Sequence, residues 1–150
     1  MCIRDRLDTA QGRGLVAVNV MKAVRGHPAL VRQACESGAQ AIVMGAGLPM
    51  DLPEMTADFP KVALVPILSE ARGVAVVLKK WMKKGKLADA VVIEHSGHAG
   101  GHLGAARLDD IHDERFDFQR VLTECHALFA ELQLGPVSYT HLTLPTIYSV

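Results

Sequence analysis

The 150-residue sequence has few aromatic residues, few cysteines and no excess of charge of either sign. Its 16 lysines and arginines balance 16 acidic residues, so no broad positive field favours a nucleic acid or an anionic membrane as partner. Cys2, Cys35 and Cys125 are odd in number and far apart, which argues against a disulfide framework and against a zinc site with closely spaced thiolates. We expect reduced thiols and no nucleic-acid partner.

Long apolar segments are also missing. No apolar run approaches the length of a membrane span, and the charged first residues lack the apolar segment of a signal peptide. We therefore expect no membrane partner and a cytoplasmic location. Because 49% of the residues are hydrophobic, the chain can still form one domain with a substantial core.

Four short apolar runs recur at residues 15–20, 41–44, 62–67 and 90–93. None alternates apolar with polar residues, which is typical of strands covered on both faces. Helical spacing occurs at 27–37, 71–84 and 116–132, with a short helix between the second and third runs. Pro28 suits a first helical turn, and Gly38 and Gly85 suit helix ends. The pattern predicts an α/β fold with a parallel sheet and outer helices.

The segment from Glu94 to Gly104 contains three histidines and four glycines in eleven residues, and it directly follows the last apolar run. Glycines let a backbone approach a flat or anionic ligand, and imidazoles exchange protons near neutral pH. The histidine spacings of three and four would gather side chains only on a helix, and the glycines argue against one. We therefore predict a ligand loop at the end of a strand, and no metal site.

Other polar or glycine-rich positions also follow apolar runs: Asn19, residues 45–47 and Ser69. Both a doubly wound sheet and a (β/α)8 barrel place their sites at the carboxyl ends of the strands, so this pattern alone leaves the two open. The missing GxGxxG fingerprint weakens the dinucleotide-binding alternative.

The two ends differ in composition from the middle. Both tyrosines and half of the threonines fall in residues 137–150. This segment resembles the translation of a transposon-end sequencing adapter, and residues 1–6 resemble its opposite strand. We expect both ends to be artefacts and residues 7–136 to be one domain from inside a longer protein. The alternative is a genuine β-prone tail that pairs with a sheet.

Four segments together resemble the nitronate monooxygenase family, formerly called 2-nitropropane dioxygenases: Val18-Asn19, residues 43–49, residues 66–72 and residues 99–104. The most specific part is Ala-Gly-Gly-His-x-Gly after a buried run, which flavin-dependent enoyl-acyl-carrier-protein reductases share. Family members are FMN-dependent (β/α)8 TIM barrels. The resemblance therefore implies a partial TIM barrel, in which the four runs are about the third to sixth strands.

The resemblance also implies roles for individual residues. Asn19 matches an asparagine that ends the third strand and contacts the flavin. Gly100 and Gly101 match glycines that approach the isoalloxazine ring, and His102 matches the histidine beside it. His95 falls where the family often has a glutamine or glutamate facing the cofactor. The family binds the FMN phosphate with loops after the seventh and eighth strands, and we expect these loops to lie beyond this chain.

The implied activity is FMN-dependent oxidation of alkyl nitronates by oxygen, with His102 as a base or as an electrostatic anchor. His98 either shapes the substrate pocket or faces solvent. One alternative is a flavin-dependent reductase that acts on enoyl thioesters or quinones with NAD(P)H. Another is that the chain as given is an inactive fragment with two open sheet edges.

Overall fold

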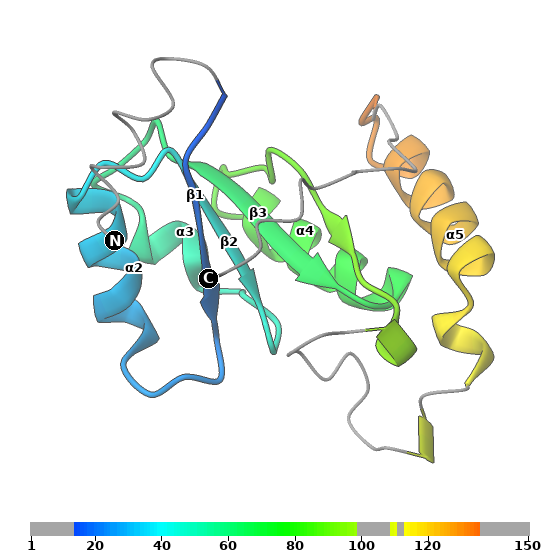
Figure 1. Cartoon of the computed structure of the whole chain (residues 1–150). Coiled ribbons are helices and arrows are strands. Elements are labelled where there is room, and N and C mark those ends of the chain that lie inside the picture. Colours follow the sequence, from blue (N-terminus) through cyan, green and yellow to red (C-terminus); the bar gives the residue numbers. More distant parts are fainter. Residues whose placement is uncertain (1–13, 99–108, 111–112, 136–150) are drawn as a thin grey trace.

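The computed structural model describes residues 14–98, 109–110 and 113–135, which form a parallel sheet backed by helices (Figure 1). The elements follow in the order β1 (Ala17–Met21), α2 (His27–Glu36), β2 (Ala41–Gly45), α3 (Leu52–Met55), β3 (Ala63–Leu68), α4 (Ala71–Met82), β4 (Val92–Ile93), η1 (Ser96–His98), η3 (Glu114–Phe116) and α5 (Phe118–Glu131). The predicted alternation of strands and helices is confirmed, including the short helix α3. None of the helices in these ranges is both long and apolar enough to cross a membrane.

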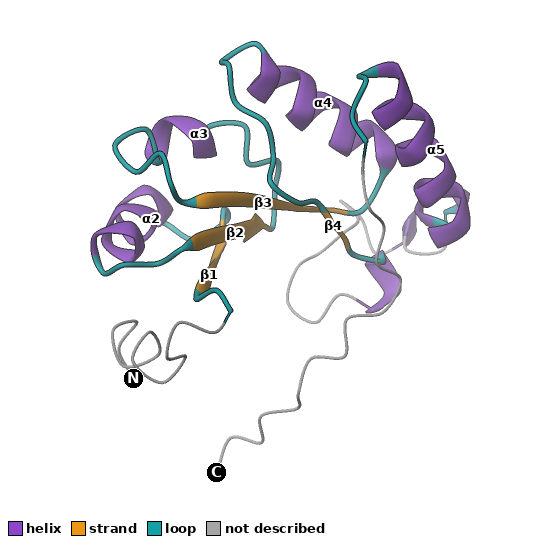
Figure 2. Ribbon diagram, turned by 90° about the horizontal axis from the view of Figure 1, so that it is seen from above, coloured by secondary structure: helices purple, strands orange, loops and turns teal. Residues whose placement is uncertain are grey.

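The sheet has the strand order β1-β2-β3-β4, and every neighbouring pair is parallel. Ala17 pairs with Ala41, and Ala41 pairs with Ala63. Viewed from above, α2, α3 and α4 all lie on one face of the sheet, and α5 lies beside α4 (Figure 2). The order of the described strands across the sheet is therefore the same as their order in the sequence.

The hydrophobic core lies between the sheet and this helix layer. Its largest fully buried side chains include Ile42 and Met44 of β2 and Trp81 of α4. The Trp81 indole Nε1 donates a hydrogen bond of 3.0 Å to the Pro49 carbonyl oxygen, which ties α4 to the loop after β2. Burial of these side chains supplies the main favourable contribution to the stability of the fold.

The opposite face of the sheet carries the alternate residues of each strand, because successive side chains point to opposite sides. We call it the helix-free face; it comprises Ala17, Asn19 and Met21 of β1, Ala41, Val43 and Gly45 of β2, Ala63, Val65 and Ile67 of β3, and Val92 of β4. The three residues from β1 are exposed, and Val43 and Val65 are half-buried. The prediction of strands covered on both faces thus differs from the described structure, where helices cover one face only.

Most element boundaries differ from the predicted ones by one or two residues. β1 continues to Met21, one residue beyond the predicted end, and β4 has two residues where 90–93 had been predicted. α5 begins at Phe118, two residues later than predicted, because the Asp117 carboxylate accepts a hydrogen bond of 2.8 Å from the Arg120 backbone N–H and caps the helix. The predicted start of α2 at His27, with Pro28 in the first turn, is confirmed.

Candidate functional site

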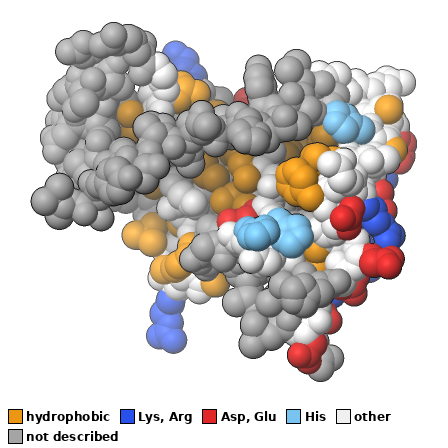
Figure 3. All heavy atoms as spheres, turned by 45° about the vertical axis from the view of Figure 1, so that its right-hand side comes forward, with side chains coloured by type: hydrophobic (Ala, Val, Ile, Leu, Met, Phe, Trp, Pro, Cys, Tyr) orange, Lys and Arg blue, Asp and Glu red, His pale blue; other side chains and the backbone are white. Residues whose placement is uncertain are grey.

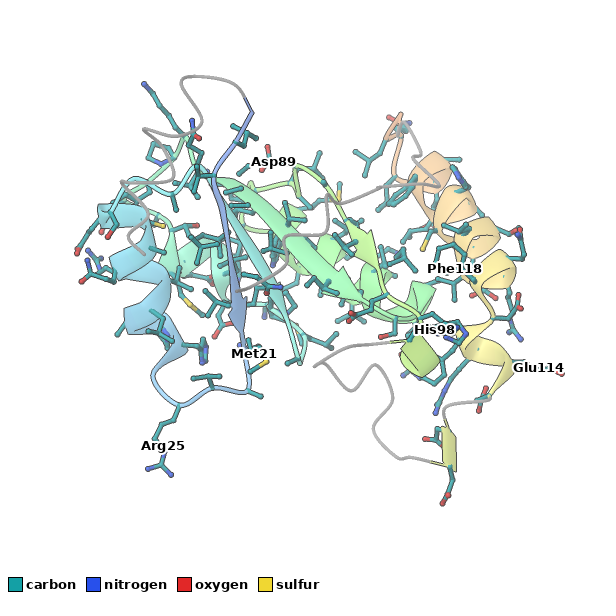
Figure 4. All side chains as sticks on the ribbon, viewed as in Figure 1. Met21, Arg25, Asp89, His98, Glu114 and Phe118 are labelled. Carbon is teal, nitrogen blue, oxygen red and sulfur yellow. The ribbon has the colours of Figure 1, made fainter. Side chains whose placement is uncertain are left out.

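The carboxyl ends of the four strands lie along one edge of the sheet, which we call the carboxyl-terminal edge. In Figure 4, Met21 and His98 lie along this edge, and Asp89 lies at the opposite one. The loops that leave it begin at Lys22, Ala46, Ser69 and Glu94. The topology therefore brings the predicted polar loops to one side of the molecule, as parallel α/β folds do with their ligand sites.

The turn after β2 has an unusual backbone. Ala46 and Gly47 have φ values of 55° and 127°, which place both residues outside the region that side-chain-bearing residues prefer. A Cβ atom built on Gly45 would lie 3.0 Å from the Ile67 Cβ atom. The Lys22 backbone N–H donates to the Gly45 carbonyl oxygen at 2.8 Å. The close approach of β2 and β3 at this edge thus depends on a glycine at position 45.

Two ion pairs hold the segment after β2, one to the loop after β1 and the other to the end of α4. The Lys22 ammonium binds the Asp51 carboxylate, and the Lys84 ammonium binds the Glu54 carboxylate. Partial burial alone would raise the pKa of Asp51, but the hydrogen bond from Lys22 keeps this pKa below its ordinary value. The Lys84 hydrogen bond lowers the pKa of Glu54. These pairs were not predicted, because Lys22 and Asp51 are 29 positions apart and no local motif links them.

His95 and His98 lie next to each other just after β4. Their ring centroids are 5.1 Å apart and the planes are tilted by 43°, and paired histidines are visible on the surface in Figure 3. The Gly97 backbone N–H donates to His95 Nδ1 at 3.0 Å. A neutral His95 ring that accepts at Nδ1 carries its proton on Nε2. This nitrogen is therefore a hydrogen-bond donor for an anionic or carbonyl oxygen.

The same hydrogen bond disfavours metal binding by His95. To bind a metal through Nε2, a neutral imidazole must move its proton to Nδ1 and lose the bond from Gly97. Among the described residues, no group of three or more His, Cys, Asp or Glu side chains lies close enough to hold a metal ion.

The structure places two of the five predicted site residues. Asn19 lies on the helix-free face, two residues before the end of β1, and not at the strand end where it was predicted. Its amide forms no hydrogen bond with another described residue. His95 lies at the carboxyl-terminal edge and is half-buried. The other three, Gly100, Gly101 and His102, lie outside the described residues.

Asn19 and His95 are not neighbours. The register places Met21, Gly45, Ile67 and Val92 side by side on the four strands. Relative to Asn19, His95 therefore lies five residues further along the strand direction and three strands away. At roughly 3.3 Å per residue and 4.8 Å per strand, the diagonal distance across a flat sheet is about 22 Å. A ligand that contacts both side chains must extend between them.

A shallow hollow of about 290 Å³ is lined by Phe59, Pro60, Lys61 and Val62. It lies just before β3 begins, at the amino-terminal end of this strand and away from the carboxyl-terminal edge. Its lining is apolar apart from Lys61. It contributes no group to the candidate site.

The sequence matches no model of a known protein family, and no curated protein matches it significantly.

Proposed function

We propose that residues 7–136 belong to an FMN-dependent oxidoreductase of the nitronate monooxygenase type. In this proposal β1 to β4 are about the third to sixth strands of a (β/α)8 barrel. The supporting observation is the strand order β1-β2-β3-β4 with α2, α3 and α4 on one face. A doubly wound sheet reverses its strand order and carries helices on both faces, whereas a barrel does neither. The described sheet therefore favours the barrel of the two architectures that the sequence left open.

The chain's own groups suit a flat ring with hydrogen-bond acceptors, as in FMN. Asn19 supplies the polar side chain of the described helix-free face, two residues before the carboxyl-terminal edge at which a barrel binds its ligand. His95 presents an Nε2–H donor at the carboxyl-terminal edge. FMN, when bound, supplies the electron-transfer chemistry. These residues fit FMN only in part, because Asn19 and His95 are so far apart that the flavin ring and its phosphate-bearing side chain would have to extend from one residue to the other.

The residues of the loop after β4 then have distinct tasks. His95 donates its Nε2–H to an oxygen that carries negative charge. His102, when neutral, takes a proton from the carbon beside the nitro group of a nitroalkane, provided that the two atoms lie within about 2.6 to 3.2 Å. When protonated, the same ring holds the nitronate oxygens by charge. The substrates of this proposal are a small nitronate and oxygen.

The test is to purify the intact protein that contains residues 7–136 and to record its visible spectrum and its nitronate-driven oxygen uptake. We expect a flavin spectrum and oxygen uptake. In a His102→Ala variant, turnover of a neutral nitroalkane should fall by about 10² to 10⁴ if His102 is the base. His126→Ala is the matched control, because His126 is an exposed histidine of α5. Colourless protein, or an unaltered His102→Ala variant, would count against the proposal.

A reductase that acts on enoyl thioesters or quinones with NAD(P)H is the second candidate, because it shares the motif at residues 99–104. Consumption of NADH without nitronate-driven oxygen uptake would favour it. The chain as given can also be inactive by itself, and the edges of β1 and β4 support this alternative: no described strand pairs with either.

A further inference from the structure

We propose that His98 is a positioning residue for His95. The His98 ring and the Gly97 backbone together fix the His95 imidazole, so that its Nε2–H group is held ready for a negatively charged oxygen. From the sequence, His98 could either shape the substrate pocket or face solvent. The orientation of His95 follows from contacts among the described residues, whereas its consequence for a substrate rests on the proposed function.

A single 3₁₀ turn brings the two rings together. The His98 backbone N–H donates to the His95 carbonyl oxygen at 3.0 Å, and η1 spans Ser96–His98. A 3₁₀-helix has about three residues per turn, so side chains three positions apart lie one above the other. The glycines of this segment were expected to keep the histidines apart, because glycine disfavours a helix. One short turn that contains one glycine nevertheless places His98 beside His95.

Two contacts define the orientation of the His95 ring. Its Nδ1 accepts a hydrogen bond of 3.0 Å from the Gly97 backbone N–H. Its centroid lies 5.1 Å from that of His98, with the two planes tilted by 43°. The last side-chain torsion of histidine has broad energy minima, so one hydrogen bond at one ring atom still lets the ring tilt. The second ring opposes this tilt.

The surroundings of the two rings give them different roles. His95 is half-buried and His98 is exposed. Within the described part of the chain, the His98 ring forms no hydrogen bond, and its ring contact is with His95. The described interactions of the His98 side chain therefore act on His95. Any effect of His98 on a molecule bound at His95 passes through this contact.

A ring held in this way suits a hydrogen-bond donor. The Nδ1 lone pair of His95 is occupied by the Gly97 N–H, so the neutral ring carries its proton on Nε2. A hydrogen bond to a charged oxygen is strong only when donor and acceptor are aligned. The anionic oxygens of a nitronate fit such a donor. His95 then binds the substrate of the proposed reaction, and the base remains His102.

The first test measures the orientation of His95 in the intact protein that contains residues 7–136, without substrate. With ¹⁵N in histidine and glycine, NMR should detect a coupling between the Gly97 amide nitrogen and His95 Nδ1 across their hydrogen bond. His98→Ala should weaken this coupling at least about twofold, and His98→Phe, which keeps a ring, should retain it. Absence of the coupling from the unmodified protein, or an equal coupling in His98→Ala, would overturn the proposal.

His126→Ala is the matched control for this measurement. His126 is also exposed, and its ring lies 6.5 Å from the Phe129 ring in an edge-to-face contact on α5. Its removal should leave the Gly97–His95 coupling unchanged. A coupling that weakens equally in His126→Ala and in His98→Ala would show a general loosening of the protein and would overturn the specific role of His98.

The second test measures oxidation of the anion of 2-nitropropane. Contacts between rings change an equilibrium by roughly two- to tenfold. His98→Ala should therefore lower kcat/KM by about this factor, mainly through a higher KM, and His98→Phe should recover most of the loss. Unaltered kinetics in a His98→Ala variant that has lost the coupling would overturn the functional role of His98.

A double-mutant cycle separates positioning from direct contact with the substrate. If His98 acts only through His95, its removal has no effect once His95 is gone. We expect His95→Ala and the double variant His95→Ala/His98→Ala to have the same kcat/KM. A further loss of about threefold or more in the double variant would overturn the proposal. Protein that shows the expected coupling but no nitronate-driven oxygen uptake would contradict only the proposed function.

Discussion

Replacing Gly45 by alanine should destabilise the protein, because β2 and β3 approach each other closely at this residue. The added Cβ atom would lie 3.0 Å from Ile67 Cβ and 3.3 Å from Ile67 Cδ1. The Cδ1 atom can rotate away, but Ile67 Cβ is fixed to the backbone of β3. Relief therefore requires the two strands to separate at the carboxyl-terminal edge. Overpacking of this kind costs about 1 to 3 kcal/mol.

Gly73→Ala is the matched control for this change. Gly73 is also buried, but it lies in α4, and the nearest atom to its added Cβ would be 3.6 Å away, in ordinary contact. Alanine in a helix is favoured over glycine by about 0.5 to 1 kcal/mol. The same substitution should therefore lower the free energy of unfolding at position 45 and raise it at position 73. Urea unfolding, followed by the fluorescence of Trp81, measures both. A Gly45→Ala variant as stable as the unmodified protein would refute the packing argument.

Three further predictions concern the core and the loops. Trp81→Phe removes the donor to the buried Pro49 carbonyl oxygen and should lower the free energy of unfolding by about 1 to 3 kcal/mol; an unchanged urea midpoint would contradict it. Burial raises the pKa of Cys125 to about 11, so iodoacetamide at pH 8 should modify Cys125 slowly in the folded protein and quickly in urea, and equal rates by peptide mass spectrometry would contradict its burial. The pKa values of Asp51 and Glu54 are lowered in the folded protein, so their ion pairs stabilise the fold at pH values above the ordinary pKa values of 3.8 and 4.5. This stabilisation is lost as the pH falls through the lower pKa values of the folded state. Asp51→Asn should therefore make the urea midpoint depend less on pH in the acid range, and an unchanged dependence would contradict the Lys22–Asp51 pair.

The order of elements could be predicted because it depends on patterns within short segments. The apolar runs at 41–44 and 62–67 became β2 and β3, and the 3.6-residue pattern after Ala71 became α4. The length of β4 could not be predicted, because a contact from another strand shortens it. The Asp89 carboxylate accepts the Leu64 backbone N–H at 2.8 Å, in the place of a strand partner. Regular pairing with β3 therefore resumes only at Val92.

The sequence could predict that the candidate site lies at the carboxyl-terminal edge of the sheet, but it could not predict the positions of single side chains there. Polar residues after apolar runs are brought to one edge by any parallel α/β sheet. The position of Asn19 within β1 depends on register, and one residue of shift reverses the face on which a side chain lies. The orientation of His95 depends on a hydrogen bond from Gly97 that only the loop conformation creates.

The most direct test of the central claim is the flavin content of the intact protein that contains residues 7–136, measured by its absorbance spectrum and by chromatography of the released cofactor. The account predicts FMN in stoichiometric amount, and its loss from the protein when Gly100 and Gly101 are replaced by bulkier residues. Folded protein that neither retains FMN on purification nor binds it when FMN is added would contradict the account.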